Sequence, residues 1–186
     1  MSIKTKLTLC VSGFVLLMLG TIGSTLLILD SQKSDGLQIN LAGRQRMLSQ
    51  RMTKELLLLS QAANEDQRAQ YQKSLGGTVS LFEKTLNALK NGGETLGGTM
   101  QPVTLPAATD AAVIEKLDDG SKLWSGVSPA LTKVVQADVT KMNKAQLDDA
   151  IAVLGANNVP LLKVMNAATG AFQQASTAKL DVLHMV

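Results

Sequence analysis

Residues 39–52 read INLAGRQRMLSQRM and place three arginines, Arg44, Arg46 and Arg51, within eight positions. Such a cluster is typical of a solvated helix face or of a patch that binds phosphate groups. No proline interrupts the chain from residue 30 to 63, and strong helix formers dominate there. We therefore expect the cluster to lie on a helix, so that helical geometry decides what each arginine contacts.

The composition favours an all-α fold. Aromatic residues make up 3% of the 186 residues, and the apolar content is mostly Leu, Ala and Val. A β-sandwich of this size would use more aromatic and β-branched residues.

The charge balance argues against a nucleic-acid partner. The net charge is +3, but without Lys4 and Lys6, which precede an apolar run, 16 basic residues remain against 15 acidic ones. A surface with this balance has no general attraction for polyanions. We predict no nucleic-acid binding.

Cys10 is the only cysteine and His184 the only histidine. A lone cysteine allows neither an intrachain disulfide nor a Cys-x-x-Cys metal site. No nucleophile–base constellation is visible either. We predict no enzyme activity, no metal and no cofactor.

The segment from residue 7 to 29, LTLCVSGFVLLMLGTIGSTLLIL, has 23 residues and no charge. As a helix it can cross a hydrocarbon core of about 30 Å. A cleaved signal peptide is the alternative, but its apolar region is shorter and ends at a small-x-small site. The positive-inside rule keeps Lys4 and Lys6 in the cytoplasm. We expect residues 1–29 to be a cytoplasmic N-terminus and a transmembrane helix of the inner membrane.

Residues 30–186 are expected to form a periplasmic, antiparallel four-helix bundle. The first helix covers 30–63, and Asn64 caps the second. A long loop rich in Gly, Pro and Thr covers about 91–109. The third helix starts at Asp110, and Pro129 either bends it or marks a new first turn.

Asn143 opens the fourth segment, GANNVP interrupts it, and a last helix runs from residue 160 to 186. In up-down-up-down order the first and last helices of a bundle both reach the membrane. A second membrane span is therefore expected just after residue 186.

Helical geometry separates the three arginines. At about 100° per residue, Arg44 and Arg51 lie within about 20° of each other, and Arg46 is about 200° from Arg44. Arg51 precedes Glu55 by four residues, a spacing that suits an ion pair. Arg44 and Arg51 are assigned to solvent or to salt bridges. The expected core face of this helix consists of Leu41, Leu48, Met52 and Leu59.

Arg46 belongs to another stripe, here called the small-residue seam, which consists of Ile39, Ala42, Arg46, Ser49, Thr53 and Leu56. Small neighbours allow another helix to approach, but an arginine in a packed seam is costly unless it is paired. At a twofold interface Arg46 would face its own copy. A small planar anion between the two guanidinium groups would accept forked hydrogen bonds from both. Alternatively, Arg46 reaches water or a carboxylate on another helix.

INLAGRQRMLSQRM resembles the start of the PilJ-type sensor domain, the N-terminal domain of type IV pili methyl-accepting chemotaxis transducers. It is also similar to the P-box of nitrate/nitrite sensor histidine kinases, approximately I-N-x-A-G-x-x-R-M-x-S-x-R. The matching positions are Ile39, Asn40, Ala42, Gly43, Arg46, Met47, Ser49 and Arg51. Arg44 and Gln45 depart from the kinases and look PilJ-like. Residues 156–169, ANNVPLLKVMNAAT, resemble the last helix of this family.

The resemblance implies a homodimeric bundle that binds nitrate, or less tightly nitrite, at the dimer axis. It implies that Arg46 acts from both subunits, with the backbone near Gly43 completing a site that includes Ala42 and Met47. The expected function is the input domain of a transmembrane chemoreceptor that signals by helix displacement. Its partners would be the membrane and cytoplasmic chemotaxis components, reached through a C-terminal region beyond residue 186.

Two alternatives stay open. One is the input domain of a nitrate/nitrite sensor histidine kinase. The other is a module that binds a pilus subunit or another protein and has no small-anion ligand, with Arg46 in a structural role.

Overall fold

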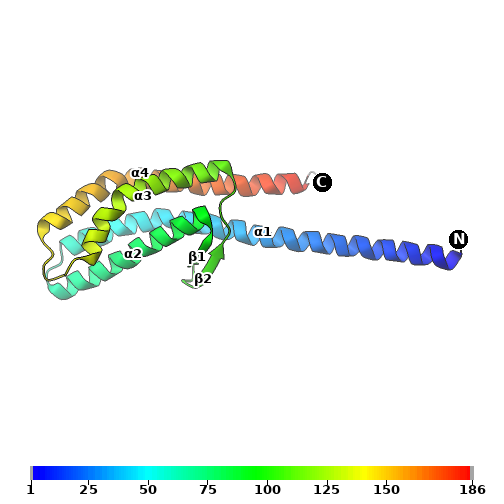
Figure 1. The fold of residues 1–186 in the computed structure, drawn as a ribbon, viewed down its shortest axis with the longest axis horizontal. Helices are drawn as coiled ribbons and strands as arrows, with labels where there is room; N and C mark the ends of the chain where they lie inside the picture. The colour runs from blue at the N-terminus through cyan, green and yellow to red at the C-terminus, as the bar shows by residue number, and fades with distance from the viewer. Residues whose placement is uncertain (1, 185–186) are drawn as a thin grey trace. The chain divides into compact units, whose positions relative to one another are not determined.

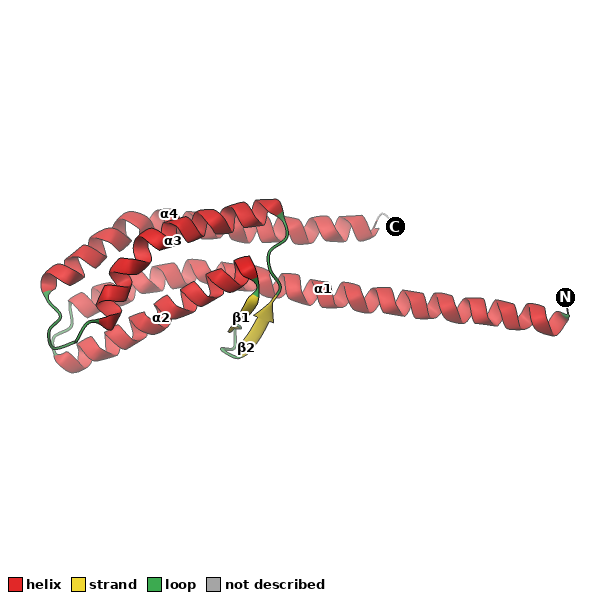
Figure 2. Ribbon diagram, viewed as in Figure 1, coloured by secondary structure: helices red, strands yellow, loops and turns green. Residues whose placement is uncertain are grey.

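The computed structural model describes residues 2–184 and divides the chain into two compact units, Met1–Gly36 and Leu37–Val186. The elements are, in order, α1 (Ile3–Ser60), α2 (Glu65–Asn91), β1 (Gly93–Leu96), β2 (Pro102–Leu105), α3 (Ala111–Gln136) and α4 (Lys144–His184) (Figure 1). The described chain is mainly helical, as predicted, with one small β-hairpin (Figure 2). The expected second membrane span falls after residue 186, outside the described residues.

The first unit is a helical segment with exposed apolar side chains. Ile3–Leu26 is long and apolar enough to cross a membrane, and no other described helix meets that criterion. The hydroxyl groups of Thr8, Thr21 and Thr25 donate to helix carbonyls three or four residues earlier. Because these three hydroxyl groups form hydrogen bonds within the helix, they are compatible with a hydrocarbon environment.

The helices of the second unit share one apolar core. α3 packs along both α2 and α4, and the hairpin packs against α2. Phe82 of α2 and Trp124 of α3 meet in this core, with ring centroids 4.5 Å apart. The predicted core face of α1 is confirmed by the burial of Leu41, Leu48, Met52 and Leu59.

The predicted helix starts are confirmed by capping hydrogen bonds. The side chains of Asn64, Asp110 and Asn143 each accept a backbone N–H from the first turn of α2, α3 and α4. These N–H groups have no carbonyl partner within their own helix. The segments that precede α2, α3 and α4 therefore end at these three cap residues.

Prolines do not end the helices of the second unit. GANNVP, predicted as an interruption, lies inside α4, which continues through Pro160. Proline removes one helix hydrogen bond, but Leu154 and Leu161 on either side are at most 1% exposed. Their packing holds the helix in place. α3 also continues through Pro129, and it bends toward its C-terminal end in Figure 1.

The predicted loop 91–109 contains the β-hairpin, which was not predicted from the sequence. β1 and β2 pair antiparallel, with Gly93 opposite Leu105. Four-residue strands are too short for an alternating pattern to stand out. Gly92 turns the chain out of α2 with φ of 75°, and a Cβ there would lie 2.9 Å from Ala107 N. Only glycine fits this position without strain.

A buried carboxylate joins α1 to α2. Glu55 is 5% exposed, and its Oε1 accepts from Arg51 Nε at 2.8 Å and from Ser74 Oγ at 2.5 Å. The predicted ion pair of Arg51 and Glu55 is thus confirmed. Because the Arg51 side chain is 52% exposed, solvent screens that ion pair. The buried hydrogen bond from Ser74 therefore matters more for stability.

Replacing Ser74 by alanine should lower the free energy of unfolding by about 1–2 kcal/mol, since a buried carboxylate oxygen loses its uncharged donor. Urea unfolding of the full chain in detergent micelles measures the change. Ser80→Ala, at an exposed serine of the same helix, should stay within about 0.5 kcal/mol of the original protein. Equal losses in both variants would contradict this role of Ser74.

Candidate functional site

Arg44 holds the hairpin, so its assignment to solvent or a salt bridge is wrong. Its Nη1 donates to Gly97 O at 2.7 Å, and its Nη2 donates to Leu96 O. Nη2 also lies 3.2 Å from Thr85 Oγ1, which in turn bonds Thr95 of β1. Burial lowers the pKa of the Arg44 guanidinium below its ordinary value. An arginine nevertheless stays charged in proteins, so Arg44 gives two hairpin carbonyls a charged donor.

Gln45, the next residue, lies in the core. It is fully buried, and its Nε2 donates to the carbonyl of Phe82 in α2 at 2.8 Å. Arg44 and Gln45 therefore attach α1 to α2 and to the hairpin from consecutive positions.

Arg46 lies where α1 meets α4. Its Nη1 donates to Asn166 Oδ1 at 2.7 Å, and its Nε approaches Gly43 O at 3.4 Å. A Cβ placed on Gly43 would be 3.6 Å from Arg46 Nη2, so the guanidinium group lies over the bare backbone of this glycine. Within residues 2–184 no hydrogen-bond partner of Nη2 is found. Arg46 is thus held on one side and has donor capacity left.

The small-residue seam meets α4 of the same chain, where the sequence predicts a second copy. Ala42, Ser49 and Leu56 are at most 1% exposed within the single chain. Gln50, beside them, exchanges hydrogen bonds with Asn158 of α4, the shorter at 2.7 Å. Amide side chains of α4, rather than a carboxylate, therefore pair with this side of α1.

An exposed stripe runs beside the seam at alternating spacings of three and four residues. This outer stripe consists of Asn40, Gly43, Met47, Gln50, Lys54 and Leu57. Met47 is 55% exposed and Leu57 41%. Positions repeated at this spacing share one helix face that a second helix can cover. Met47 and Leu57 are the two apolar side chains on that face.

The four residues predicted to contact nitrate are divided among these surfaces. Arg46 and Gly43 lie together, Met47 is exposed on the outer stripe, and Ala42 is 1% exposed in the seam. Asn166, which positions Arg46, was missed, because one asparagine in a helical stretch carries no distinctive signal. No group of three His, Cys, Asp or Glu residues that could hold a metal ion occurs in the described part of the chain.

Removing the Arg44 guanidinium should loosen the hairpin. We expect Arg44→Ala to speed amide hydrogen exchange across 93–105 by about tenfold or more and to lower the unfolding free energy by about 1.5–3 kcal/mol, the range for bonds to charged groups. Exchange measured by mass spectrometry on the full chain in detergent tests this.

Arg44→Lys keeps the charge but not the planar fork, so it should give an intermediate effect on the hairpin. Arg68→Ala, at an arginine of α2, should leave hairpin exchange unchanged. If amide hydrogen exchange across residues 93–105 is unchanged in Arg44→Ala, the hairpin is stable without Arg44 and this role of Arg44 is contradicted.

Comparison with known families adds one finding. A family model described as the type IV pili methyl-accepting chemotaxis transducer N-term matches residues 27–150. The matched range is more than half of the chain and contains the arginine-bearing part of α1, all of α2, the hairpin and α3. No curated protein and no solved structure matches the chain.

Proposed function

The chain belongs to the type IV pili methyl-accepting chemotaxis transducer N-terminal family, and on this premise we propose that it senses a small ligand for a transmembrane chemoreceptor. The family is one of chemotaxis transducers, not of catalysts, and the apolar helix Ile3–Leu26 fits a membrane receptor. We place the unit Leu37–Val186 in the periplasm and the apolar helix in the inner membrane.

We infer that the ligand is nitrate or a similar small planar anion and that Arg46 binds it. The geometry of Arg46 carries this inference: Asn166 fixes one end of the guanidinium group, and Gly43 lies beneath the other. The donors that remain can form the forked pair of hydrogen bonds that a planar oxyanion accepts. Asn166 adds no negative charge that would repel the anion.

We further propose that the second unit acts as an antiparallel four-helix bundle and pairs with a second copy through the outer stripe. Gly43 lies on this stripe, and the Arg46 guanidinium group covers its bare backbone, so a partner helix would meet that group there. Arg46 lies beside Gly43, and a twofold axis near this glycine would bring two guanidinium groups to one anion.

The signal would be a small displacement of packed helices, a known way of transmitting a switch. An anion held between two copies of α1 favours the arrangement in which those helices are close. It shifts the receptor only by its difference in affinity for the two arrangements. Cytoplasmic chemotaxis components would read the change. In the alternative, the same sensor unit would control a histidine kinase instead of chemotaxis components.

Nitrate titration of the full chain in nanodiscs tests the ligand. Arg46→Ala should abolish the calorimetric signal, and Arg46→Lys should weaken it at least tenfold, because a lysine has charge but no fork. Arg68→Ala should bind like the original protein. If nitrate gives no signal with the folded, dimeric protein, the anion proposal fails and an interaction module becomes the better reading.

Disulfide cross-linking tests the dimer. In a Cys10→Ser background, Met47→Cys should form a linked dimer on mild oxidation, because two copies of the outer stripe would bring these positions within disulfide range. Ser125→Cys, an exposed position of α3, should not. If Met47→Cys gives only monomers, pairing through the outer stripe is contradicted. The same holds if Met47→Cys and Ser125→Cys form linked dimers in equal yield.

A further inference from the structure

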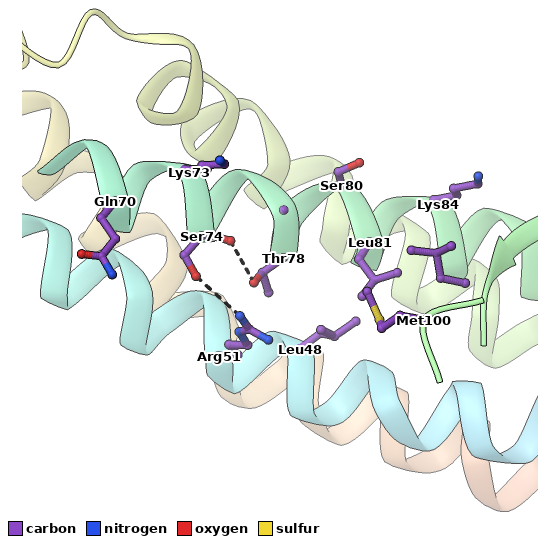
Figure 3. Close-up of a pocket in the computed structure, with 12 residues that line it drawn as sticks. Leu48, Arg51, Gln70, Lys73, Ser74, Thr78, Ser80, Leu81, Lys84 and Met100 are labelled. Atoms are coloured by element: carbon purple, nitrogen blue, oxygen red, sulfur yellow. Dashed lines mark hydrogen bonds between the residues drawn. The ribbon is translucent and has the colours of Figure 1, made fainter. Parts of the chain in front are cut away.

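A groove of about 710 Å³ lies between α1, α2 and the hairpin, away from Arg46 (Figure 3). This volume is in the range of sites for small organic molecules. Apolar side chains come from all three elements: Leu48 of α1, Leu81 of α2, and Leu96 and Met100 of the hairpin. Serine and threonine hydroxyls of α2 add polar atoms along one wall. The groove thus combines an apolar surface with hydrogen-bonding groups.

The charged residues that line the groove are all basic: Arg51, Lys73 and Lys84. Glu55 neutralises part of the Arg51 charge through Nε, while Arg51 Nη2 reaches Ser74 Oγ at 3.5 Å. Figure 3 shows Arg51 of α1 and Ser74 of α2 joined by this contact. Lys73 and Lys84 are exposed, and in the described part of the chain neither forms an ion pair. An occupant of this groove should therefore be an anion.

Gly77 keeps the wall of the groove open. A Cβ added there would meet no atom within 4 Å, whereas one on the adjacent Gly76 would lie 3.0 Å from Val135 Cγ1. Packing thus restricts Gly76 but not Gly77. Glycine inside a helix costs roughly 0.5–1 kcal/mol relative to alanine. The space left free at Gly77 belongs to the groove, and a ligand can occupy it.

Met100, one of the two hairpin residues that line the groove, has an unusual backbone conformation. Its φ is 61°, the one positive φ of a non-glycine residue among residues 2–184. Such a backbone costs of order 1–3 kcal/mol and persists where the surroundings enforce it. Here the turn does so: Met100 N donates to Gly97 O at 3.0 Å, and Arg44 binds that same carbonyl. The flexible thioether side chain, 54% exposed, can adapt to an apolar ligand.

We propose that this groove binds a small organic carboxylate with an apolar body. The carboxylate lies beside Arg51 and Lys73, since the Ser74 hydroxyl proton is already donated to Glu55. The body extends along Leu81 toward Met100. Leu81 is seven positions after Ser74, about 10 Å along a helix, so a body of this length fits. The site is separate from the anion site proposed at Arg46, and the ligand would bridge α1 to α2 and to the hairpin.

Calorimetry with octanoate, below its micellar concentration, on the full chain in nanodiscs tests the proposal. Binding should be saturable, and 1-octanol and acetate should each bind at least tenfold more weakly, because each lacks one half of the recognised chemistry. Octanol binding as tightly as octanoate would overturn the role of the cations. Acetate binding as tightly would overturn the role of the apolar surface.

Two variant pairs locate the site. Gly77→Leu should weaken octanoate binding at least tenfold by filling the groove, while Gly77→Ala should stay within about threefold; neither should lower the unfolding midpoint, since both replace a helix-interior glycine. Lys73→Ala should weaken binding about fivefold, and Lys133→Ala, at an exposed lysine of α3 outside the groove, should not. Unchanged binding in Gly77→Leu would overturn the assignment.

Arg46→Ala distinguishes the two proposals. Octanoate should bind this variant as it binds the original protein, because Arg46 does not line the groove. If Arg46→Ala removes nitrate and octanoate binding together, the ligands share one site and the separate groove site is overturned. Failure of nitrate to bind would leave the octanoate result unaffected.

Discussion

The hydrogen bonds from the Arg44 guanidinium to the carbonyls of Leu96 and Gly97 fix the position of the hairpin. A two-stranded hairpin is marginal by itself in water, and a partly buried guanidinium group must be paired. The Arg44 guanidinium group therefore stabilises the hairpin, and the hairpin carbonyls provide the hydrogen-bond acceptors that the guanidinium group needs. Leu96 and Met100 line the groove, so the groove depends on the same contact. The turn that Arg44 holds also keeps Met100 in its left-handed conformation.

One rigid helix carries all three arginines, and their helical angles decide their separate contacts. Arg44 binds the hairpin, and Arg46 binds α4 through Asn166. Arg51 pairs with Glu55 of α1 itself, whose carboxylate accepts a hydrogen bond from Ser74 of α2. A rotation or translation of this part of α1 must therefore move all three contacts at once. Because packed elements tend to have discrete rather than continuous arrangements, an anion that favours one position of Arg46 also favours one position of the hairpin.

Local patterns in the sequence predicted the features that depend on local physics. The caps at Asn64 and Asp110 and the pair of Arg51 with Glu55 follow from spacings of two to four residues. The contacts of Arg44 could not be predicted, because its acceptors are backbone carbonyls about 50 residues away. Backbone carbonyls occur at every residue and leave no signature in the sequence. Packing on both sides of Pro160 likewise overrode the local rule for proline.

The seam around Arg46 shows how far helical geometry alone can reach. Geometry correctly separated Arg46 from Arg44 and Arg51, but it could not identify which helix approaches. Asn166, 120 positions along the chain, occupies one side of the guanidinium group. The dimer that we propose therefore pairs through the outer stripe, one helical step around α1, rather than through the seam itself. In that arrangement Arg46 would lie at the border between the α4 contact and the proposed dimer surface. At such a border an anion can form hydrogen bonds to Arg46 while the amide of Asn166 holds the guanidinium plane, so the contact with α4 supports an anion site instead of competing with it.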